Sequence, residues 1–370
     1  MNKLKIFNIF VFLSTLARSL IDIFIPIILY NKGLNIESII FFLVIYYSLS
    51  FILVMPLSII GKKITFKWLM IITSISIIIA YYFLIIDDLS LINILLFALF
   101  HVINTQAYWL SRHYYALSVL PKRDIADEVG NIIIVTTIAL IPISYLGALM
   151  MNGFDKEVIF SIILFFYLIS IIPLYKLKEV KDNNKLNNID NIILPKKSFW
   201  FLILAQFKMI SRYLFPLFIF INVKDNYEYI GIFNTSIGIA STFFVYYYAR
   251  KIDKEKKDYL ILSGVLGCLV YLFKLNIIDT GILLLVALFE GLVDKMYEVS
   301  FNRNLYALGH KNESILYVTI IEGLQNFSRL IIVLVFGLLF VDINTILYIS
   351  AFMLIITGLV GFDDGYGGYK

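Results

Sequence analysis

The sequence predicts an all-α polytopic membrane protein with about twelve transmembrane helices in two pseudo-symmetric six-helix bundles. Three observations support this fold class. Hydrophobic residues make up 61% of the 370 residues and charged residues 15%, whereas a soluble domain carries about 25% charged residues. Apolar runs recur at the length of about 20 residues that a helix needs to cross a bilayer. The second half of the chain also repeats features of the first half.

Each apolar run is interpreted as one membrane-crossing helix. The runs are continuous, whereas the strands of a membrane barrel alternate apolar and polar residues over about ten positions. The first run is too long for the apolar core of a signal peptide and lacks a small-residue cleavage site, so it is also interpreted as a helix. The predicted spans are residues 6–30, 37–60, 65–86, 90–118, 129–151, 157–175, 199–222, 228–249, 259–276, 279–302, 314–339 and 343–361.

The loops between these spans predict the orientation of the chain. Cationic loops stay on the cytoplasmic side of a membrane, and most loop lysines and arginines fall in alternate connections. We therefore expect a multi-pass protein of the plasma membrane with both termini in the cytoplasm. The loops expected on the opposite side contain Lys32, Lys156, Lys224 and Lys274.

The longest polar stretch, residues 176–197, is rich in Asn and Lys and falls midway along the chain. Such a stretch is typical of a linker. The predicted organisation is a first bundle over 1–178, a central cytoplasmic loop over 179–197, a second bundle over 198–362 and a cytoplasmic tail over 363–370. Cys268 is the only cysteine, which excludes an intramolecular disulfide and a cysteine metal cluster.

The two halves match at charged and proline positions. The segment RHYYAL at 112–117 corresponds to RNLYAL at 303–308, each near the end of the fourth helix of its half. Internal repeats of this kind are a signature of secondary transporters, whose binding sites lie near the midplane between the halves. A shift of 190 residues pairs Arg18 with Lys208, Asp22 with Arg212 and Pro26 with Pro216.

The chain resembles the major facilitator superfamily over nearly its whole length. The loop Gly61-Lys-Lys-Ile-Thr-Phe-Lys67 is similar to that family's loop between helices 2 and 3, although Thr65 replaces the family's Asp. The mirrored loop retains an acid at Asp253, and Arg112 resembles the family's helix-4 arginine. The resemblance implies a monomer in which helices 1, 4, 7 and 10 line a central cavity.

Charged residues also occur inside the predicted spans. One charge at the centre of a membrane helix costs about 2.5–3.5 kcal/mol, so these residues must be paired or hydrated. Setting aside the loop cations and the rim residues Arg112 and Arg303, the count is balanced, and helices 3, 6, 9 and 12 carry none. The cations are Arg18, Lys208, Arg212, Lys295 and Arg329, and the acids are Asp22, Glu290, Asp294, Glu298 and Glu322.

These residues are assigned candidate roles. Arg18 and Lys208 are expected to grip an anionic substrate group, unless Arg18 and Asp22 form only a structural ion pair. No metal site and no cofactor are predicted. The substrate-binding candidates are Arg18, Lys208, Arg212, Arg329, Asn104, Tyr108 and Gln325; those for proton coupling or a charge network are Asp22, Glu290, Asp294 and Glu322; those for gating or structure are Arg112, Arg303, Gly61 and Asp253.

The leading functional hypothesis is a secondary active transporter that works by alternating access. Its substrate is expected to be a small anionic or zwitterionic solute, moved by proton coupling or exchange. The alternative is a proton-coupled exporter of drugs or metabolites. A polytopic membrane enzyme or lipid-handling protein, built around residues such as His113 and Asp127, and a non-transporting sensor or scaffold are weaker hypotheses. The net charge of +5 lies mainly in short loops, so no nucleic-acid partner is expected.

Overall fold

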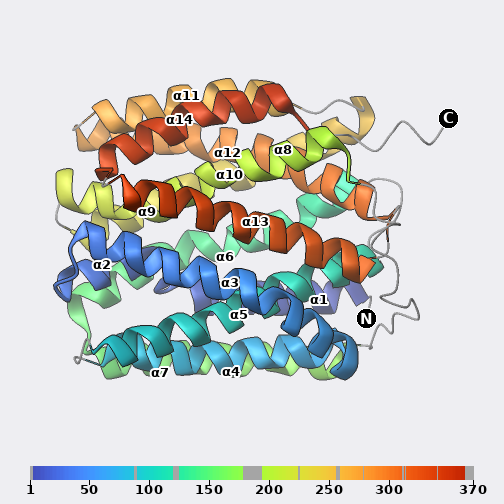
Figure 1. Cartoon of the computed structure of the whole chain (residues 1–370), viewed down its shortest axis with the longest axis horizontal. Helices are drawn as coiled ribbons and strands as arrows, with labels where there is room; N and C mark the ends of the chain where they lie inside the picture. The colour runs from blue at the N-terminus through green and yellow to red at the C-terminus, as the bar shows by residue number, and fades with distance from the viewer. Residues whose placement is uncertain are drawn as a thin grey trace.

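The computed structural model describes residues 3–86, 90–119, 125–177, 194–223, 226–255, 259–277, 279–310, 312, 314–339 and 341–362. Over these ranges the regular structure is helical, and the helices run side by side along one long axis (Figure 1). The first half contains α1 (Lys3–Ser19), η1 (Asp22–Phe24), α2 (Ile25–Asn31), α3 (Ile36–Ile64), α4 (Phe66–Ile85), α5 (Leu91–Val119), α6 (Ile125–Gly153) and α7 (Lys156–Lys176). The second half contains α8 (Lys196–Leu204), α9 (Gln206–Asn222), α10 (Tyr227–Glu255), α11 (Leu260–Asn276), α12 (Thr280–Gly309), α13 (Ser314–Leu338) and α14 (Ile343–Val360).

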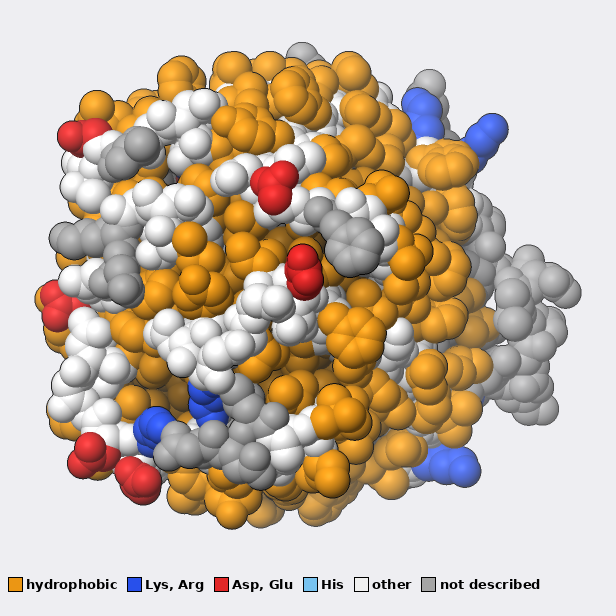
Figure 2. All heavy atoms as spheres, turned by 60° about the vertical axis from the view of Figure 1, so that its left-hand side comes forward, with side chains coloured by type: hydrophobic (Ala, Val, Ile, Leu, Met, Phe, Trp, Pro, Cys, Tyr) orange, Lys and Arg blue, Asp and Glu red, His pale blue; other side chains and the backbone are white. Residues whose placement is uncertain are grey.

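The predicted fold class is confirmed. In the described ranges, ten helical segments are long and apolar enough to cross a membrane. The two other long helices do not meet these criteria. Helix α11 has only 17 residues, and α12 has 30 residues but carries a dense group of charged side chains. Figure 2 shows apolar side chains over the broad flank of the molecule and charged side chains toward its ends. The predicted central loop and tail fall largely on 178–193 and 363–370, outside the described residues.

The first predicted membrane span of each half is interrupted, although each was predicted as one continuous helix. In the first half, α1 ends at Ser19 and a 3-10 turn precedes α2, whose first turn contains Pro26. Proline lacks a backbone N–H, so a helix tolerates it best in the first turn. In the second half, α8 ends at Leu204 and α9 begins at Gln206. Both interruptions lie close to interior charged residues.

Two helix pairs form most of the interface between the bundles, α6 with α10 and α3 with α13. Small residues bring α6 and α10 together at both of their ends. A Cβ atom added to Gly130 would lie 2.5 Å from the Cβ of Ala249, and one added to Gly231 would lie 2.6 Å from the Cβ of Ala148. These helices therefore approach too closely for a larger side chain at either glycine.

The two ends of the bundle differ in charge. The beginning of α1 and the end of α14 lie at the same end (Figure 1), which is called the lysine-rich end below; the other is the opposite end. The assignment of the lysine-rich end to the cytoplasm stays a prediction. Exposed cations at the lysine-rich end include Lys63, Lys196, Lys197, Arg250 and Lys251.

Candidate functional site

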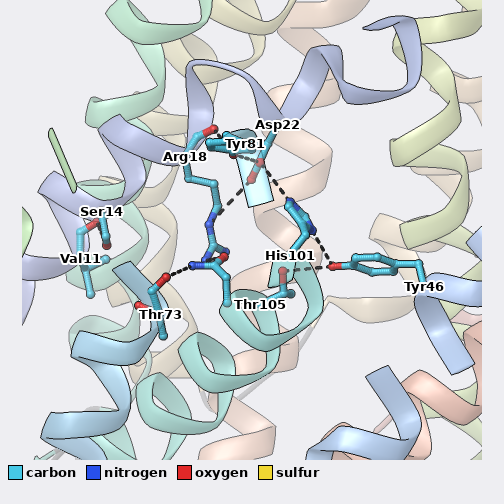
Figure 3. Close-up of polar contacts among 10 residues, drawn as sticks. Val11, Ser14, Arg18, Asp22, Tyr46, Thr73, Tyr81, His101 and Thr105 are labelled. Carbon is cyan, nitrogen blue, oxygen red and sulfur yellow. Dashed lines mark hydrogen bonds and ion pairs between the residues drawn. The ribbon is translucent and has the colours of Figure 1, made fainter. Parts of the chain in front are cut away.

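A polar network inside the first bundle joins four of the predicted site residues, of which Figure 3 labels Arg18 and Asp22. The Arg18 guanidinium donates to Oδ1 of Asn104 at 2.9 Å, and its Nε lies 3.7 Å from Oδ2 of Asp22. The same guanidinium stacks 4.3 Å from the ring centroid of Tyr108. Arg18 and Asp22 are four residues apart, as their helical spacing predicted, and Asn104 and Tyr108 come from α5.

The Asp22 carboxylate is shared with residues that sequence analysis did not select. Tyr81 on α4 donates a hydrogen bond to Oδ1 of Asp22, and Nε2 of His101 lies 3.5 Å from the same oxygen. The other ring nitrogen of His101 lies 3.2 Å from the hydroxyl of Tyr46, which donates to Thr105 at 3.0 Å. Hydrogen bonds therefore run from Asp22 through His101 to α3 (Figure 3).

In the second bundle, Lys208 forms an ion pair with a carboxylate of its own half. Its Nζ lies 2.8 Å from Oδ1 of Asp294 and 4.1 Å from the ring centroid of Tyr297. The Lys208 side chain is 7% exposed and that of Asp294 is 13% exposed. Arg18 and Lys208 thus each pair within their own bundle, and the structure shows no contact between them.

Lys274 was assigned to a loop on the opposite side, and that assignment is wrong. The residue lies in the last turn of α11, is 1% exposed, and places Nζ 2.6 Å from Oε1 of Glu290 on α12. Three aromatic rings surround the ammonium, with centroids at 3.4, 4.5 and 5.3 Å: those of Phe215, Tyr271 and Phe233, respectively. The ninth predicted span, α11, therefore does carry an interior charge, because the long side chain of Lys274 turns inward to the buried carboxylate of Glu290.

A cavity of about 40 Å³ adjoins this pair and is lined by Arg212, Glu290 and Asp294. Glu290 is buried, and its Oε2 has no hydrogen-bond partner among the described residues. Arg212 also lines this cavity, although much of its side chain is exposed. Among the described residues, no carboxylate lies within ion-pair distance of Arg212. The cavity has room for about one water molecule.

Arg329 on α13 lies at the interface of the bundles and is held by neutral amides. Its guanidinium donates to Gln206 at 2.7 Å, to Gln325 at 3.1 Å and to Asn326 at 3.2 Å. Asn326 in turn donates to Gln106 of the first bundle at 2.9 Å. In the described part of the chain, Arg329 has no carboxylate within ion-pair distance. The network fixes the guanidinium and leaves its charge uncompensated.

Another polar group, centred on His113, joins the two bundles at the lysine-rich end. His113 is buried between Tyr306 of α12 at 2.8 Å and Glu322 of α13 at 3.2 Å. The Glu322 carboxylate therefore contacts His113 of the first bundle. Glu298 forms an ion pair with Lys295 on its own helix.

The predicted gating residues lie near this end. Arg112 packs 4.8 Å from the ring centroid of Trp109, and Arg303, 1% exposed, donates to Asn304 at 2.9 Å. Gly61 is buried where α3 turns into α4, and a Cβ there would lie 2.9 Å from Phe66 and Leu69. The side chain of Asp253 lies outside the described residues.

The structure adds cations to the interior charges predicted from the sequence. Among the described residues it buries Arg112, Arg303 and Lys274, which had been placed at the rim or in a loop. In the described part of the chain, Arg329 forms hydrogen bonds to neutral amides and has no carboxylate partner, and a charge buried without a counter-charge is costly, so this position favours an anion. The interior cations are Arg18, Arg112, Lys208, Arg212, Lys274, Lys295, Arg303 and Arg329; the carboxylates are Asp22, Glu290, Asp294, Glu298 and Glu322.

Two six-helix bundles with polar networks inside them and at their interface are typical of polytopic membrane transporters. The chain belongs to the Major Facilitator Superfamily, whose family model matches residues 7–292. Its structure is similar to that of the human organic anion transporter MFSD10 (TETRAN), with a TM-score of 0.71 and 11% sequence identity over 96% of this chain and 98% of that chain. Among curated proteins, no sequence match was found. The protein is therefore a membrane transporter rather than an enzyme.

Proposed function

We propose that the protein is a secondary active transporter that carries a small anionic or zwitterionic solute along the interface of its two bundles. The observation that carries this proposal is Arg329. Its guanidinium is held at the interface by three neutral amides. A guanidinium binds carboxylate and phosphate groups through paired hydrogen bonds. An anionic solute would therefore provide the negative charge that Arg329 does not receive from a carboxylate among the described residues.

Arg212 is a second cation on α9 without a carboxylate within ion-pair distance among the described residues. It lines the small cavity that Glu290 and Asp294 also line, so it contributes to the charge of this region and does not by itself form a solute site. The solved relative MFSD10 is named for organic anions, but an identity of 11% extends only the fold to this chain. The anion proposal therefore stands on the interior charges.

Alternating access is supported by contacts that bridge the bundles at both ends. At the opposite end, Asn31 of α2 donates to the hydroxyl of Tyr227 of α10 at 2.9 Å. At the lysine-rich end, His113 bonds Tyr306. Each set of contacts must open in turn if the halves rock about a central site. The energy source under this proposal is either a proton gradient or exchange for a second solute.

Proton-coupled export of organic cations is the second candidate. The observation that favours it is the aromatic cage around Lys274, since aromatic rings and carboxylates also recognise free ammonium groups. In the structure, the tethered ammonium of Lys274 fills that cage. A free cation would have to displace it, which favours the anion hypothesis.

A flux screen in proteoliposomes tests the proposal. The purified chain is reconstituted with internal carboxylates, phosphate esters, amino acids or organic amines, and exchange of each labelled solute is measured with and without a pH gradient. We expect saturable exchange of at least one anionic or zwitterionic class. Lys197→Gln, which removes an exposed cation at the lysine-rich end, should leave the rate unchanged. Saturable flux restricted to organic cations would contradict the proposal and favour the exporter.

A further inference from the structure

A large groove lies away from the charged pathway, between the beginning of α3 and the end of α13. It has a volume of about 640 Å³ and lies at the opposite end of the molecule. Its walls are mainly apolar and include Ile40, Phe41, Leu334 and Leu338. Phe41 is 62% exposed and Leu338 is 74% exposed. The volume falls within the range of about 300–1,000 Å³ that is typical of ligand pockets.

Two carboxylates, Glu37 and Asp342, stand in this groove, and its lining contains no lysine or arginine. Glu37 is in the first turn of α3 and Asp342 is the N-cap of α14. Both acids are therefore at helix ends, where the apolar part of the membrane gives way to headgroups. Hydrogen bonds from the side chain and backbone N–H of Thr345 lower the pKa of Asp342, so its carboxylate is charged at neutral pH.

We propose that this groove binds a phospholipid with a primary ammonium headgroup, of the phosphatidylethanolamine type. One acyl chain lies against the apolar walls of α3 and α13, and the ammonium donates hydrogen bonds to the carboxylates of Glu37 and Asp342. Charge-assisted hydrogen bonds of this kind are stronger than neutral ones. A choline headgroup has the same charge but no N–H donor, and a glycerol headgroup leaves the lipid anionic beside two acids.

The groove touches both bundles, since α3 belongs to the first and α13 to the second. A bound lipid therefore contacts the two halves where they meet. Under the proposed function, this contact biases the opening of the opposite end. Lipid binding itself does not depend on transport, so it is measured directly and separately.

Native mass spectrometry of the purified full chain tests the site with three lipids of identical acyl chains and ethanolamine, choline or glycerol headgroups. We expect ethanolamine lipid occupancy to exceed that of the other two by about tenfold or more, the ratio that one charge-assisted hydrogen bond gives. The double variant Glu37→Gln/Asp342→Asn should lose this preference while Asn retains the helix cap. Equal occupancy by all three lipids, or an unchanged preference in the double variant, would overturn the proposal.

Two further variants separate the groove from general effects on the protein. Glu157→Gln removes an exposed acid from the first turn of α7, outside the groove, and should keep the wild-type preference. Gly337→Leu leaves both carboxylates in place but adds a side chain toward Ile40, to which an added Cβ would lie at 3.4 Å. It is expected to lower ethanolamine lipid occupancy about fivefold. Full occupancy in Gly337→Leu would place the lipid elsewhere.

Discussion

Lys274→Met is expected to destabilise the protein by about 3–5 kcal/mol, because it leaves the carboxylate of Glu290 buried without its cation. The two side chains are 1% and 7% exposed, and their charged atoms are 2.6 Å apart. Glu290 already has one oxygen without a hydrogen-bond partner among the described residues, and the other accepts from Lys274, so the substitution also removes that hydrogen bond. Equilibrium unfolding in mixed detergent micelles measures the change.

Two comparison variants make this prediction specific. Lys274→Met/Glu290→Gln removes both charges and should recover most of the lost stability, since replacement of a whole buried pair is far less costly than removal of one partner. Lys295→Met removes another buried lysine, but the side chain of its partner Glu298 is 30% exposed. Its effect should be smaller. Equal losses in Lys274→Met and Lys295→Met, or no recovery in the double variant, would show that burial of Glu290 is not the cause.

Arg329→Gln is expected to weaken the affinity for the anionic solute by about 30-fold or more, as removal of one partner of a buried charge pair costs about 2–5 kcal/mol. The side chain keeps a polar group at the interface but removes the positive charge. Arg329→Lys keeps the charge and loses the paired donor geometry, so its loss should be intermediate. Calorimetric titration with the best anion from the flux screen measures these affinities.

The fold of each Arg329 variant is checked by its unfolding midpoint in detergent. Lys197→Gln serves as the control because it also removes one cation, at an exposed position in the first turn of α8. Wild-type affinity is expected for this control. If Arg329→Gln binds and exchanges the anion like the wild type, Arg329 only stabilises the interface of the bundles and the proposed site is elsewhere.

The fold was predictable from sequence because hydropathy and loop charge are properties of single segments. The ion pair of Arg18 with Asp22 was also predictable, since residues four apart share a helix face. Lys274 was not, because a lysine near a helix end either extends to the membrane surface or turns inward. The acid that draws it inward, Glu290, comes from the next helix, and only the packing of α11 on α12 brings them together.

The remaining site residues depend on tertiary contacts between distant segments. Arg329 was selected as an interior cation, but its partners Gln206 and Asn326 come from α9 and α13, and a third helix joins through Gln106. Asn and Gln side chains are neutral, so their presence in a predicted span does not by itself indicate a binding site. Tyr81, which bonds Asp22, is one of 25 tyrosines and has no distinctive spacing. Such partners become visible only when the helices are packed.

The α6–α10 interface offers a matched pair of variants for alternating access. Gly130 packs against Ala249 at the lysine-rich end, and Gly231 packs against Ala148 at the opposite end. Valine at Gly130 should wedge the lysine-rich end open, and valine at Gly231 should wedge the other end open, because each new Cβ would clash within 3 Å. The two substitutions therefore favour opposite states.

Distances between paired spin labels test this claim most directly. Cys268 is the only cysteine, so Cys268→Ser gives a background for labels at Asn131 and Lys251 near the lysine-rich end, or at Asn152 and Glu228 near the opposite end. Gly130→Val is expected to lengthen only the first distance and Gly231→Val only the second. If both variants change both distances alike, or change neither, the bundles do not open in alternation and the account is contradicted.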